Sequence, residues 1–222
     1  MTLGFFPAGN GNDIAEALGL PKDPIAAANV FLQAKPRRID ILRAEFQSGG
    51  RGLLIAAGGT GLDAEAAQLA NTRFKRWPGV TRYLAGALWS LRNYQPLGIE
   101  AEMETDAGPA HWNGKVILAA IANAPCYGSG FRIAPEARVD DGWMNLVIVE
   151  MLPWSRVMEA IPILLRSGDL RWPEVHRFRA RRARITADRP ALVHGDGELL
   201  GKTPVEFRVE AGAMRAIAPA QS

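Results

Sequence analysis

The sequence predicts an α+β fold in which a large antiparallel β layer carries a few helices. Apolar and glutamate side chains alternate strictly over residues 99–104, as in a half-buried strand. Residues 116–122 form a continuous apolar run, as in a buried central strand. The segment from 176 to 218 is rich in strand-forming stretches. The 222 residues are 48% hydrophobic and 22% charged, which is typical of a soluble globular protein.

The N-terminal segment predicts one strand and two helices. Leu3–Phe6 is a short apolar strand, and the first helix begins at Asp13, a capping residue with Glu16 as its reciprocal partner. A second helix begins at Pro24 and ends before Pro36. A lone strand–loop–helix unit cannot bury both of its faces. We therefore expect this segment to be the last unit of a larger α/β layer.

The middle of the chain predicts two strands followed by two helices. Residues 37–43 and 52–57 are the strands, and a glycine-containing turn joins them. Helical composition covers Asp63–Trp77, and Pro78-Gly79 interrupts it. A second helix covers Val80–Asn93.

The C-terminal half predicts mainly strands around one helix. Asp140-Asp141-Gly142 is a turn, and Leu146–Met151 is a strand. Pro153 begins a helix that ends near Arg166. Gly212 is expected to turn the last hairpin, and the remaining strands cover residues 176–186, 191–194, 205–209 and 214–218.

The composition excludes several classes of protein. The net charge of +3, from 26 basic and 23 acidic residues, gives no argument for nucleic acid binding. The single cysteine, Cys126, excludes a disulfide scaffold and a cysteine-based zinc site. Apolar runs fall short of the ~18 residues that a membrane-spanning helix needs, and the N-terminus lacks signal-peptide features. We therefore expect a cytoplasmic protein.

The first candidate site is Gly9-Asn10-Gly11-Asn12-Asp13. Glycines let the backbone approach a phosphate, and N–H groups ahead of a helix attract anions. Asp13 is suited to hold Mg²⁺ through water. The alternative is a glycine turn with an Asp cap, which is a common structural pattern.

Residues 58–64 partly match the dinucleotide-binding pattern G-x-G-x-x-G/A and follow an apolar strand. That pattern also needs an acidic residue about 20 positions later. No Asp or Glu occurs between Ala66 and Ile99, so we reject dinucleotide binding. We expect a tight strand-to-helix turn here, with Asp63 near the start of the helix.

The same acid-free stretch combines basic and aromatic side chains. This mixture suits an anionic lipid surface or single-stranded nucleic acid. A solvated basic helix whose aromatic side chains face the core is the structural alternative. The residues are Arg73, Lys75, Arg76, Arg82 and Arg92 with Phe74, Trp77, Tyr83, Trp89 and Tyr94.

Three further patterns each allow two interpretations. Asp140-Asp141 suits a hard cation or is simply a turn. The carboxylates of Asp196 and Glu198, which follow His194, suit a general base on a hydroxyl or lie in a plain hairpin. An arginine run is either a solvated strand face or a contact for an anion or phospholipid: Arg177, Arg179, Arg181, Arg182 and Arg184.

The order and spacing of these motifs resemble the bacterial diacylglycerol kinase-like lipid kinases, which are related to sphingosine kinases and more distantly to NAD kinases. Residues 7–15 resemble the family's PAGTGNDFA, residues 38–40 its RxIDL and residues 57–64 its AGxGFDA. Residues 127–142 closely resemble YYGGGMRIAPDARLDDG. Residues 196–204 resemble the ending DGEPLGxTP, so the similarity covers essentially the whole chain.

This resemblance implies two domains. Residues 1–27 would be a remnant of the α/β domain that holds ATP, and residues 28–222 would be the β-sandwich domain of the lipid kinase. The family's GGDGT phosphate-binding loop is expected some tens of residues before residue 7. The resemblance therefore implies that this chain lacks the GGDGT part and is inactive alone.

The resemblance also implies a reaction, the ATP- and Mg²⁺-dependent phosphorylation of a lipid hydroxyl, with a diacylglycerol-like substrate at the inner membrane surface. Glu198 would be the base on that hydroxyl, Asp13 would join the catalytic water network around Mg²⁺, and Asp141 would hold a structural cation. Five residues would bind the nucleotide: Gly9, Asn10, Gly11, Asn12 and Asp196.

Other functions stay open at this point. The main alternative is a non-catalytic lipid- or partner-binding module derived from a lipid kinase. An NAD kinase, whose substrate is soluble, is a weaker alternative. No nucleic acid partner is expected, and a homodimer is left open.

Overall fold

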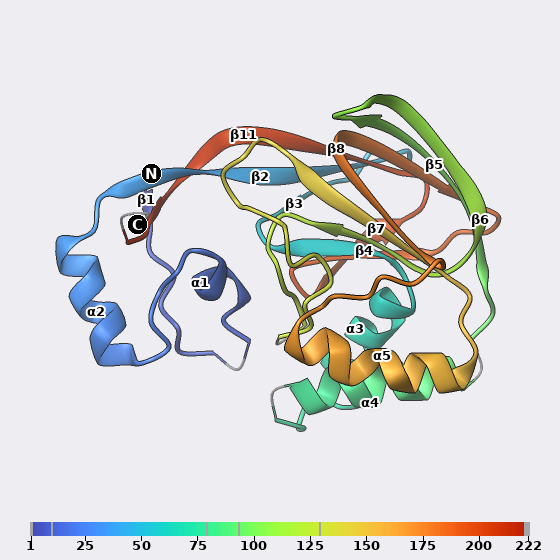
Figure 1. The fold of residues 1–222 in the computed structure, drawn as a ribbon, viewed down its shortest axis with the longest axis horizontal. Helices are drawn as coiled ribbons and strands as arrows, with labels where there is room; N and C mark the ends of the chain where they lie inside the picture. Colours follow the sequence, from blue (N-terminus) through green and yellow to red (C-terminus); the bar gives the residue numbers. More distant parts are fainter. Residues whose placement is uncertain (1, 10, 79, 93, 129, 220–222) are drawn as a thin grey trace.

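The structure is a computed structural model that describes residues 2–9, 11–78, 80–92, 94–128 and 130–219. An 11-stranded, mostly antiparallel sheet forms its body, and five helices lie beside it (Figure 1), which confirms the predicted α+β class. The helices are α1 (Asp13–Ala17), α2 (Pro24–Gln33), α3 (Leu62–Asn71), α4 (Val80–Leu91) and α5 (Trp154–Arg166). The strands are β1 (Thr2–Leu3), β2 (Pro36–Phe46), β3 (Arg51–Leu54), β4 (Ala57–Gly61), β5 (Leu97–Thr105), β6 (Gly108–Ala122), β7 (Met144–Glu150), β8 (Val175–Ala187), β9 (Leu192–Gly195), β10 (Glu198–Lys202) and β11 (Val205–Ile217).

The sheet curls until its two ends meet. The strand order is β10-β9-β4-β6-β5-β8-β11-β2-β3, and β7 pairs with both β6 and β8. The side chain of Leu54, on β3, packs directly over Gly58 of β4 and Gly195 of β9. The curled sheet therefore encloses a core of apolar side chains, among them Leu42, Phe207, Ile121, Met144 and Ile185.

The predicted strand patterns are confirmed in the centre of the sheet. On β5, Ile99, Ala101 and Met103 are buried, and the glutamates between them face solvent. The apolar run at residues 116–122 lies in β6, between β4 and β7, and is almost entirely buried.

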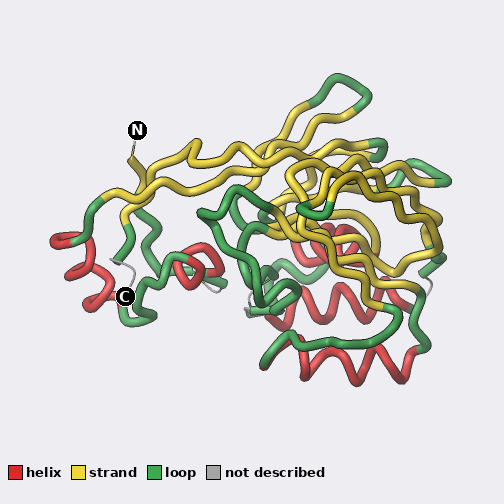
Figure 2. The backbone as a smooth tube through the Cα atoms, turned by 45° about the horizontal axis from the view of Figure 1, so that its top comes forward, coloured by secondary structure: helices red, strands yellow, loops and turns green. Residues whose placement is uncertain are grey.

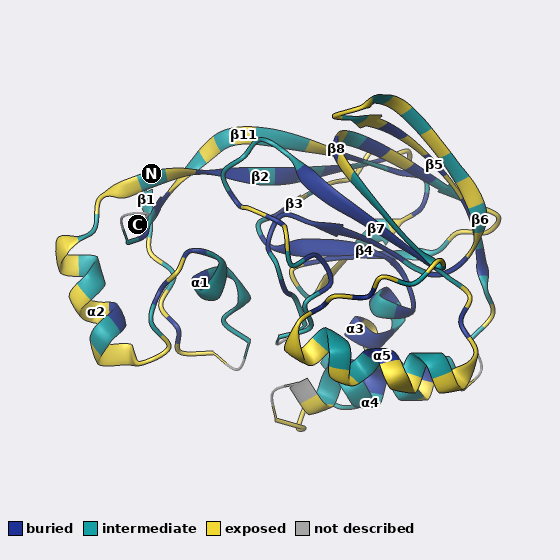
Figure 3. Cartoon of the chain, in the orientation of Figure 1, coloured by how far each residue is buried: buried dark blue, intermediate teal, exposed yellow. Residues whose placement is uncertain are grey.

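Three helices cover one outer face of the sandwich. α3, α4 and α5 lie together beside β6 and β7 (Figure 1), where a second apolar cluster includes Leu62, Ile117 and Val149. Pro153 stands directly before α5, as predicted. The outer side of α5 is largely exposed, whereas most of α4 is of intermediate exposure (Figure 3).

The N-terminal residues form a small unit of β1, α1 and α2 beside the sandwich. The ribbon of β2 and β11 runs out from the sandwich to reach it (Figure 2), and β1 pairs in parallel with the end of β11. Its apolar cluster combines alanines, such as Ala15 and Ala216, with the larger side chains of Leu18, Leu20 and Ile39. The predicted domain boundary at residues 27 and 28 falls inside α2.

Strand β4 is made mostly of glycine, where the sequence predicted a turn. A Cβ at Gly58 would lie 2.2 Å from the carbonyl oxygen of His194, and one at Gly59 would lie 2.4 Å from that of Ala119. The backbones of β6 and β9 therefore approach β4 too closely for side chains. Gly61 has φ 113° and α3 begins at the next residue, so strand and helix join without a loop.

Four further predictions are corrected. Asp13 is the first residue of α1 rather than its cap, because Asn12, with φ 57°, occupies the N-cap position. The helix predicted to Trp77 ends at Asn71 and continues as turns, since the Phe74 N–H bonds to the Leu69 carbonyl.

The other two corrections concern strands. Gly212 does not turn a hairpin, because β11 is one strand with a register shift between Glu210 and Met214. The strand predicted over residues 52–57 is split into β3 and β4, because the N–H groups of Ile55 and Ala56 bond to the Asp196 carboxylate and these two residues lie outside both strands.

Candidate functional site

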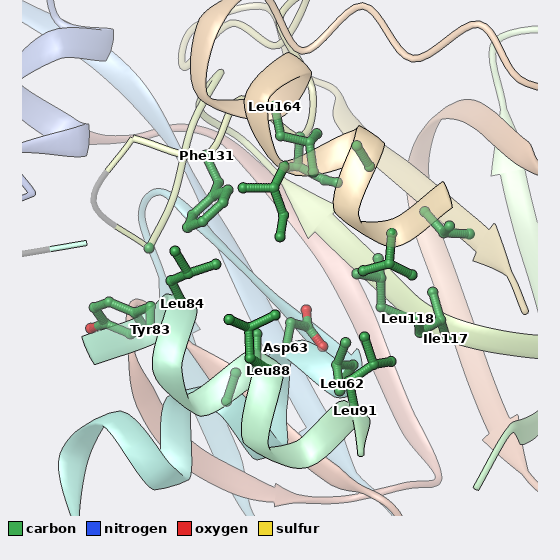
Figure 4. Close-up of a pocket in the computed structure, with 18 of the residues that line it drawn as sticks. Leu62, Asp63, Tyr83, Leu84, Leu88, Leu91, Ile117, Leu118, Phe131 and Leu164 are labelled. Atoms are coloured by element: carbon green, nitrogen blue, oxygen red, sulfur yellow. The ribbon is translucent and has the colours of Figure 1, made fainter. Parts of the chain in front are cut away.

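An apolar pocket lies between the helical layer and the sheet (Figure 4). Its walls come from α3, α4, α5 and β6, for example Leu62, Leu88, Leu164 and Ile117. The cavity volume is about 150 Å³. A dry apolar cavity of about this volume in another protein admits benzene, so this one can admit part of a hydrocarbon chain.

Asp63 is the one charged residue among the described residues that line this pocket. It stands in the first turn of α3, and its side chain is only 5% exposed. One carboxylate oxygen, Oδ1, accepts the N–H of Ala64. The other, Oδ2, lies 3.1 Å from Nε2 of His194 and 3.4 Å from the hydroxyl of Tyr127. The pocket therefore has one polar end in an otherwise apolar wall.

His194, on β9, and Tyr127, in the loop after β6, hold this carboxylate. Their rings stack with centroids 5.9 Å apart, and the His194 side chain is 3% exposed. Burial, together with the nearby charge of Asp63, raises the pKa of Tyr127 well above its ordinary value. The phenol therefore stays protonated and acts as a hydrogen-bond donor to Asp63.

A second acidic side chain, Glu65, lies near this end. Burial raises the pKa of Glu65, and a hydrogen bond from Ser90 opposes that rise. Burial and the charges of Asp63 and Glu65 also raise the pKa of Tyr94. The Glu65 carboxyl and the Tyr94 phenol therefore lie in low-dielectric surroundings near Asp63 and hold their protons more tightly than they would in water.

The hairpin between β9 and β10 carries the predicted residues Asp196 and Glu198. The carboxylate of Asp196 accepts three backbone N–H groups, from Ile55 at 2.6 Å, Ala56 at 2.9 Å and Ala57 at 3.2 Å. The Asp196 carboxylate is therefore bound to the backbone where β3 ends and β4 begins. Its predicted role in nucleotide binding stays a prediction.

The same hairpin meets the rim of the pocket. The Asn71 amide, at the end of α3, donates to the Gly197 carbonyl oxygen at 2.6 Å. The hydroxyl of Tyr83, a pocket-lining residue on α4, lies 3.2 Å from where a Gly197 Cβ would be. Glu198 is the next residue and is exposed. The hairpin with the candidate base thus touches the pocket through Gly197 at the rim and through His194 at the polar end.

The Gly9–Asp13 segment is only partly described, because Asn10 lies outside the described residues. The Gly9 N–H donates to Oδ1 of Asn12 at 2.9 Å, and Asn12 Nδ2 returns a bond to the Gly9 carbonyl at 2.9 Å. A phosphate could use the Gly9 N–H only by displacing the Asn12 side chain. The roles of Gly9, Gly11 and Asn12 in nucleotide binding stay predictions.

Asp13 lies at the joint between the N-terminal unit and the sandwich. It is hydrogen-bonded to the Cys126 thiol, which is 1% exposed. Burial, followed by the charges of Asp13 and Glu16, raises the pKa of Cys126 to about 12. The catalytic role of Asp13 stays a prediction.

Protein groups occupy both carboxylate oxygens of Asp141, the predicted cation ligand. Oδ1 accepts the Trp143 N–H at 3.0 Å, and Oδ2 accepts Arg179 Nη2 at 2.9 Å. Arg179 would have to move before Asp141 could hold a cation. Within the described residues, no group of three or more His, Cys, Asp or Glu side chains is placed to hold a metal ion.

The arginine run on β8 is largely paired within the protein. Arg177 donates to the Ile133 carbonyl at 2.8 Å, and Arg182 bonds to Glu104 at 3.0 Å and to Glu206 at 2.7 Å. These bonds favour the structural interpretation over contact with an external anion.

The sequence did not predict the cluster of Asp63, His194 and Tyr127. Residues 63 and 194 are 131 positions apart, and only the pairing of β4 with β9 brings them together. The available signal was His194, a histidine within a short strand two residues before Asp196.

Two family models match the chain. The model for the YegS C-terminal NAD kinase β-sandwich-like domain matches residues 56–218, and the model for the diacylglycerol kinase catalytic domain matches residues 1–44. A protein named diacylglycerol kinase from Mycobacterium tuberculosis is 28% identical over 220 residues, which are 98% of this chain and 69% of that protein. A protein named probable lipid kinase YegS-like from Chromohalobacter salexigens is 32% identical over 176 residues, 75% of this chain and 52% of that protein.

The fold also matches a solved structure. A crystal structure of a diacylglycerol kinase from Bacillus anthracis superposes with a TM-score of 0.70 at 15% identity. The match covers 98% of this chain and 67% of that one, and it shows a shared fold. Within the described residues, no helix is long and apolar enough to cross a membrane.

Proposed function

The chain belongs to the YegS C-terminal NAD kinase β-sandwich-like domain family, and from this we propose that it provides the lipid-binding part of a kinase that phosphorylates the hydroxyl of a diacylglycerol-like lipid. The names of its relatives in Mycobacterium tuberculosis and Chromohalobacter salexigens support a lipid kinase. ATP as the phosphate donor and Mg²⁺ as its partner are part of the same proposal.

One observation carries the proposal: the apolar pocket and the hairpin with Glu198 share a boundary. Acyl chains fit the wall formed by residues such as Leu84, Leu88 and Leu164, which exclude water from a hydrocarbon. The polar end of the lipid then lies toward Asp63 or the rim near Tyr83 and Gly197. This orientation would bring a lipid hydroxyl toward the Glu198 hairpin.

In this proposal Glu198 accepts the proton of the lipid hydroxyl while the hydroxyl oxygen attacks the γ-phosphoryl group and ADP leaves. Catalysis of phosphoryl transfer is mostly positioning and charge neutralisation. Bound ATP would supply the phosphoryl group. The described residues do not fit a complete Mg²⁺ site by themselves, so we assign no step to the ion.

A kinase assay tests the role of Glu198. The chain is joined to the GGDGT-containing part that the resemblance implies and is assayed with dioctanoylglycerol micelles, Mg²⁺ and labelled ATP. In that protein Glu198→Gln should lower kcat by about 10²-fold, as for the loss of a general base. Glu102→Gln, an exposed glutamate on β5, is the matched control and should retain the wild-type rate. An unchanged rate in Glu198→Gln would remove Glu198 from the mechanism.

A binding assay tests the pocket without relying on turnover. Leu88→Trp places a larger side chain in the cavity and should weaken dioctanoylglycerol binding by tenfold or more, whereas Leu53→Trp, at a 60% exposed position, should not. Specific binding without phosphorylation would favour the alternative of a non-catalytic lipid-binding module. No binding that depends on the pocket would overturn the proposal, as would phosphorylation of NAD in place of the lipid.

A further inference from the structure

Helix α5 is apolar on two faces. One face lines the pocket with Val157, Ala160, Ile161 and Leu164. A second stripe, at spacings of four, four and three residues, points to solvent: Trp154, Met158, Pro162 and Leu165. The exposed fractions of Trp154, Met158 and Leu165 are 52%, 42% and 39%. A helix with apolar side chains on both faces is expected where neither face is left in water.

The turn after α3 adds an aromatic and basic cluster. The guanidinium of Arg73 lies 4.0 Å from the ring centroid of Trp89, and Phe74 packs edge-on against Trp77 at 5.4 Å and Trp89 at 6.4 Å. Trp77 and Trp89 are nonetheless 52% and 49% exposed. Their amphipathic rings are of the type that lies at the level of lipid headgroups.

Positive charge at this turn is not balanced by nearby acids. Arg73, Lys75 and Arg76 are exposed, and no described carboxylate lies within salt-bridge distance of them. The chain between Ala66 and Ile99 contains no acidic residue. The turn therefore presents basic side chains to an external partner of negative charge.

These two surfaces lie on the same helical layer. α4 and α5 run side by side on the outer side of the molecule (Figure 1), and the pocket lies between them and the sheet (Figure 4). We call the α5 stripe together with the residue 73–77 turn and Trp89 the α4–α5 face. An apolar stripe beside basic and aromatic residues matches the two layers of a bilayer surface, the acyl boundary and the anionic headgroups.

We propose that the α4–α5 face docks on an anionic membrane, with the α5 stripe in the interface and Arg73, Lys75 and Arg76 on lipid phosphates. The role of this docking rests on the proposed function, because a docked protein could take a membrane lipid into the pocket without the lipid crossing water. The partner is the lipid surface itself, and α4 and α5, which belong to this face, also line the pocket.

Vesicle flotation tests the charge requirement. The chain should bind vesicles of phosphatidylcholine with 30% phosphatidylglycerol and should bind pure phosphatidylcholine at least tenfold more weakly. Arg73→Glu with Arg76→Glu should reduce binding to the anionic vesicles at least tenfold. Arg51→Glu with Arg215→Glu makes the same change in net charge at exposed strand positions outside the face, and should reduce binding less than threefold.

Tryptophan fluorescence tests the orientation. Three of the six tryptophans lie on the α4–α5 face, namely Trp77, Trp89 and Trp154. Brominated lipid in the vesicles should quench the fluorescence, and Trp154→Phe should remove part of that quenching. Trp143→Phe should leave it unchanged, because Trp143 packs against Arg179 and Arg181 away from the face. Trp154→Ser with Met158→Ser should weaken binding while the thermal unfolding midpoint is retained.

Several results would overturn the docking proposal. These are equal losses in the two charge variants, quenching that does not depend on Trp154, and tighter binding of a single-stranded oligonucleotide that Arg73→Glu with Arg76→Glu abolishes. Burial of the face between two copies, seen as a dimer by light scattering, would also overturn it. Docking without lipid phosphorylation, in the protein joined to the GGDGT-containing part, leaves this inference standing while the kinase proposal fails. Phosphorylation of dioctanoylglycerol without vesicle binding would support the kinase proposal and overturn the docking proposal.

Discussion

The sandwich and the N-terminal unit are folded in different ways. The sandwich buries large side chains such as Phe207, Met144 and Ile121 completely. In the N-terminal unit, much of α2 is exposed (Figure 3), and the one buried residue of this helix is Ala27. Its apolar residues Ile25 and Leu32 are 75% and 84% exposed. Stability from burial scales with the apolar area removed from water. The sandwich therefore has its own core, whereas the N-terminal unit depends on the ribbon of β2 and β11.

Asp40 lies where these two regions join. This buried residue of β2 accepts the N–H of Gly142 through Oδ2 and the N–H of Gly212 through Oδ1, both at 2.7 Å. It thus ties the loop at residue 142 to the register shift in β11. If the two regions differ in stability as the packing indicates, changes in each should produce effects of different size and extent.

The largest effect is expected in the sandwich core. Phe207→Ala removes a fully buried ring from the centre of the sheet and should lower the free energy of unfolding by about 3–5 kcal/mol. Urea denaturation followed by circular dichroism measures this loss. Leu53→Ala, at an exposed position of β3, should change stability by less than about 0.5 kcal/mol. Equal losses in the two variants would contradict the assigned core.

The next effect is expected at the joint. Asp40→Ala leaves the two N–H groups of Gly142 and Gly212 without their acceptor and should cost roughly 2–4 kcal/mol of unfolding free energy. Asp40→Asn keeps one acceptor oxygen, so its loss should be intermediate. A loss below that of a surface substitution would mean that Asp40 does not hold the loop at residue 142 to the register shift in β11.

Cys126 can report the opening of the joint itself. It is buried beneath Asp13, so a thiol reagent reaches it only when the N-terminal unit moves away or the whole chain unfolds. We expect labelling to indicate an opening free energy at least about 1 kcal/mol below the global value from urea, because the unit has the smaller core. Equal values would show that the two regions unfold together.

The pH dependence at Cys126 follows from the same burial. Its pKa is raised to about 12, so the folded state holds the thiol proton more tightly than the unfolded chain, whose pKa is about 8.5. The resulting stabilisation is complete below about pH 8.5 and is lost as the pH rises toward 12. The stability difference between wild type and Cys126→Ser, measured by urea denaturation from pH 8 to 11, should therefore shift steadily against the wild type. A constant difference would contradict the burial.

The smallest effect is expected within α2. Asp23 caps this helix by accepting the Ala26 N–H at 2.7 Å, and Asp23→Ala should cost about 1 kcal/mol. Hydrogen exchange of α2 amides should become about fivefold faster, while amides of β6 and β7 should be unaffected. Asp169→Ala, an exposed aspartate outside the N-terminal unit, is the control. Faster exchange throughout the sandwich would remove the distinction between the two regions.

Local patterns account for what could be predicted. The alternation on β5 and the apolar run in β6 reflect burial at each position, and Pro24 and Pro153 mark the starts of α2 and α5. These signals depend on neighbours along the chain, so sequence periodicity reveals them.

The features that the sequence could not predict depend on contacts between residues that are far apart in the chain. Asp196 splits β3 from β4 by bonding to backbone groups about 140 residues earlier. His194 reaches Asp63 only because β9 pairs with β4. The register shift at Gly212 depends on Asp40, which lies far away in sequence. Residue types alone cannot give these pairings, because strand register is set by the whole sheet.

The glycines of β4 allow a side chain beside this strand to contact a residue of the neighbouring strand. A strand normally forms a wall, with side chains that separate what lies on its two faces. At Gly59 that wall is only as thick as the backbone, and Asp63 Oδ2 lies 3.1 Å from where a Cβ would stand. The carboxylate therefore reaches across β4 to His194 on the next strand. The missing side chain at residue 59 therefore lets Asp63, at the pocket, contact the strand that leads to Glu198. A single methyl group at residue 59 would block this contact.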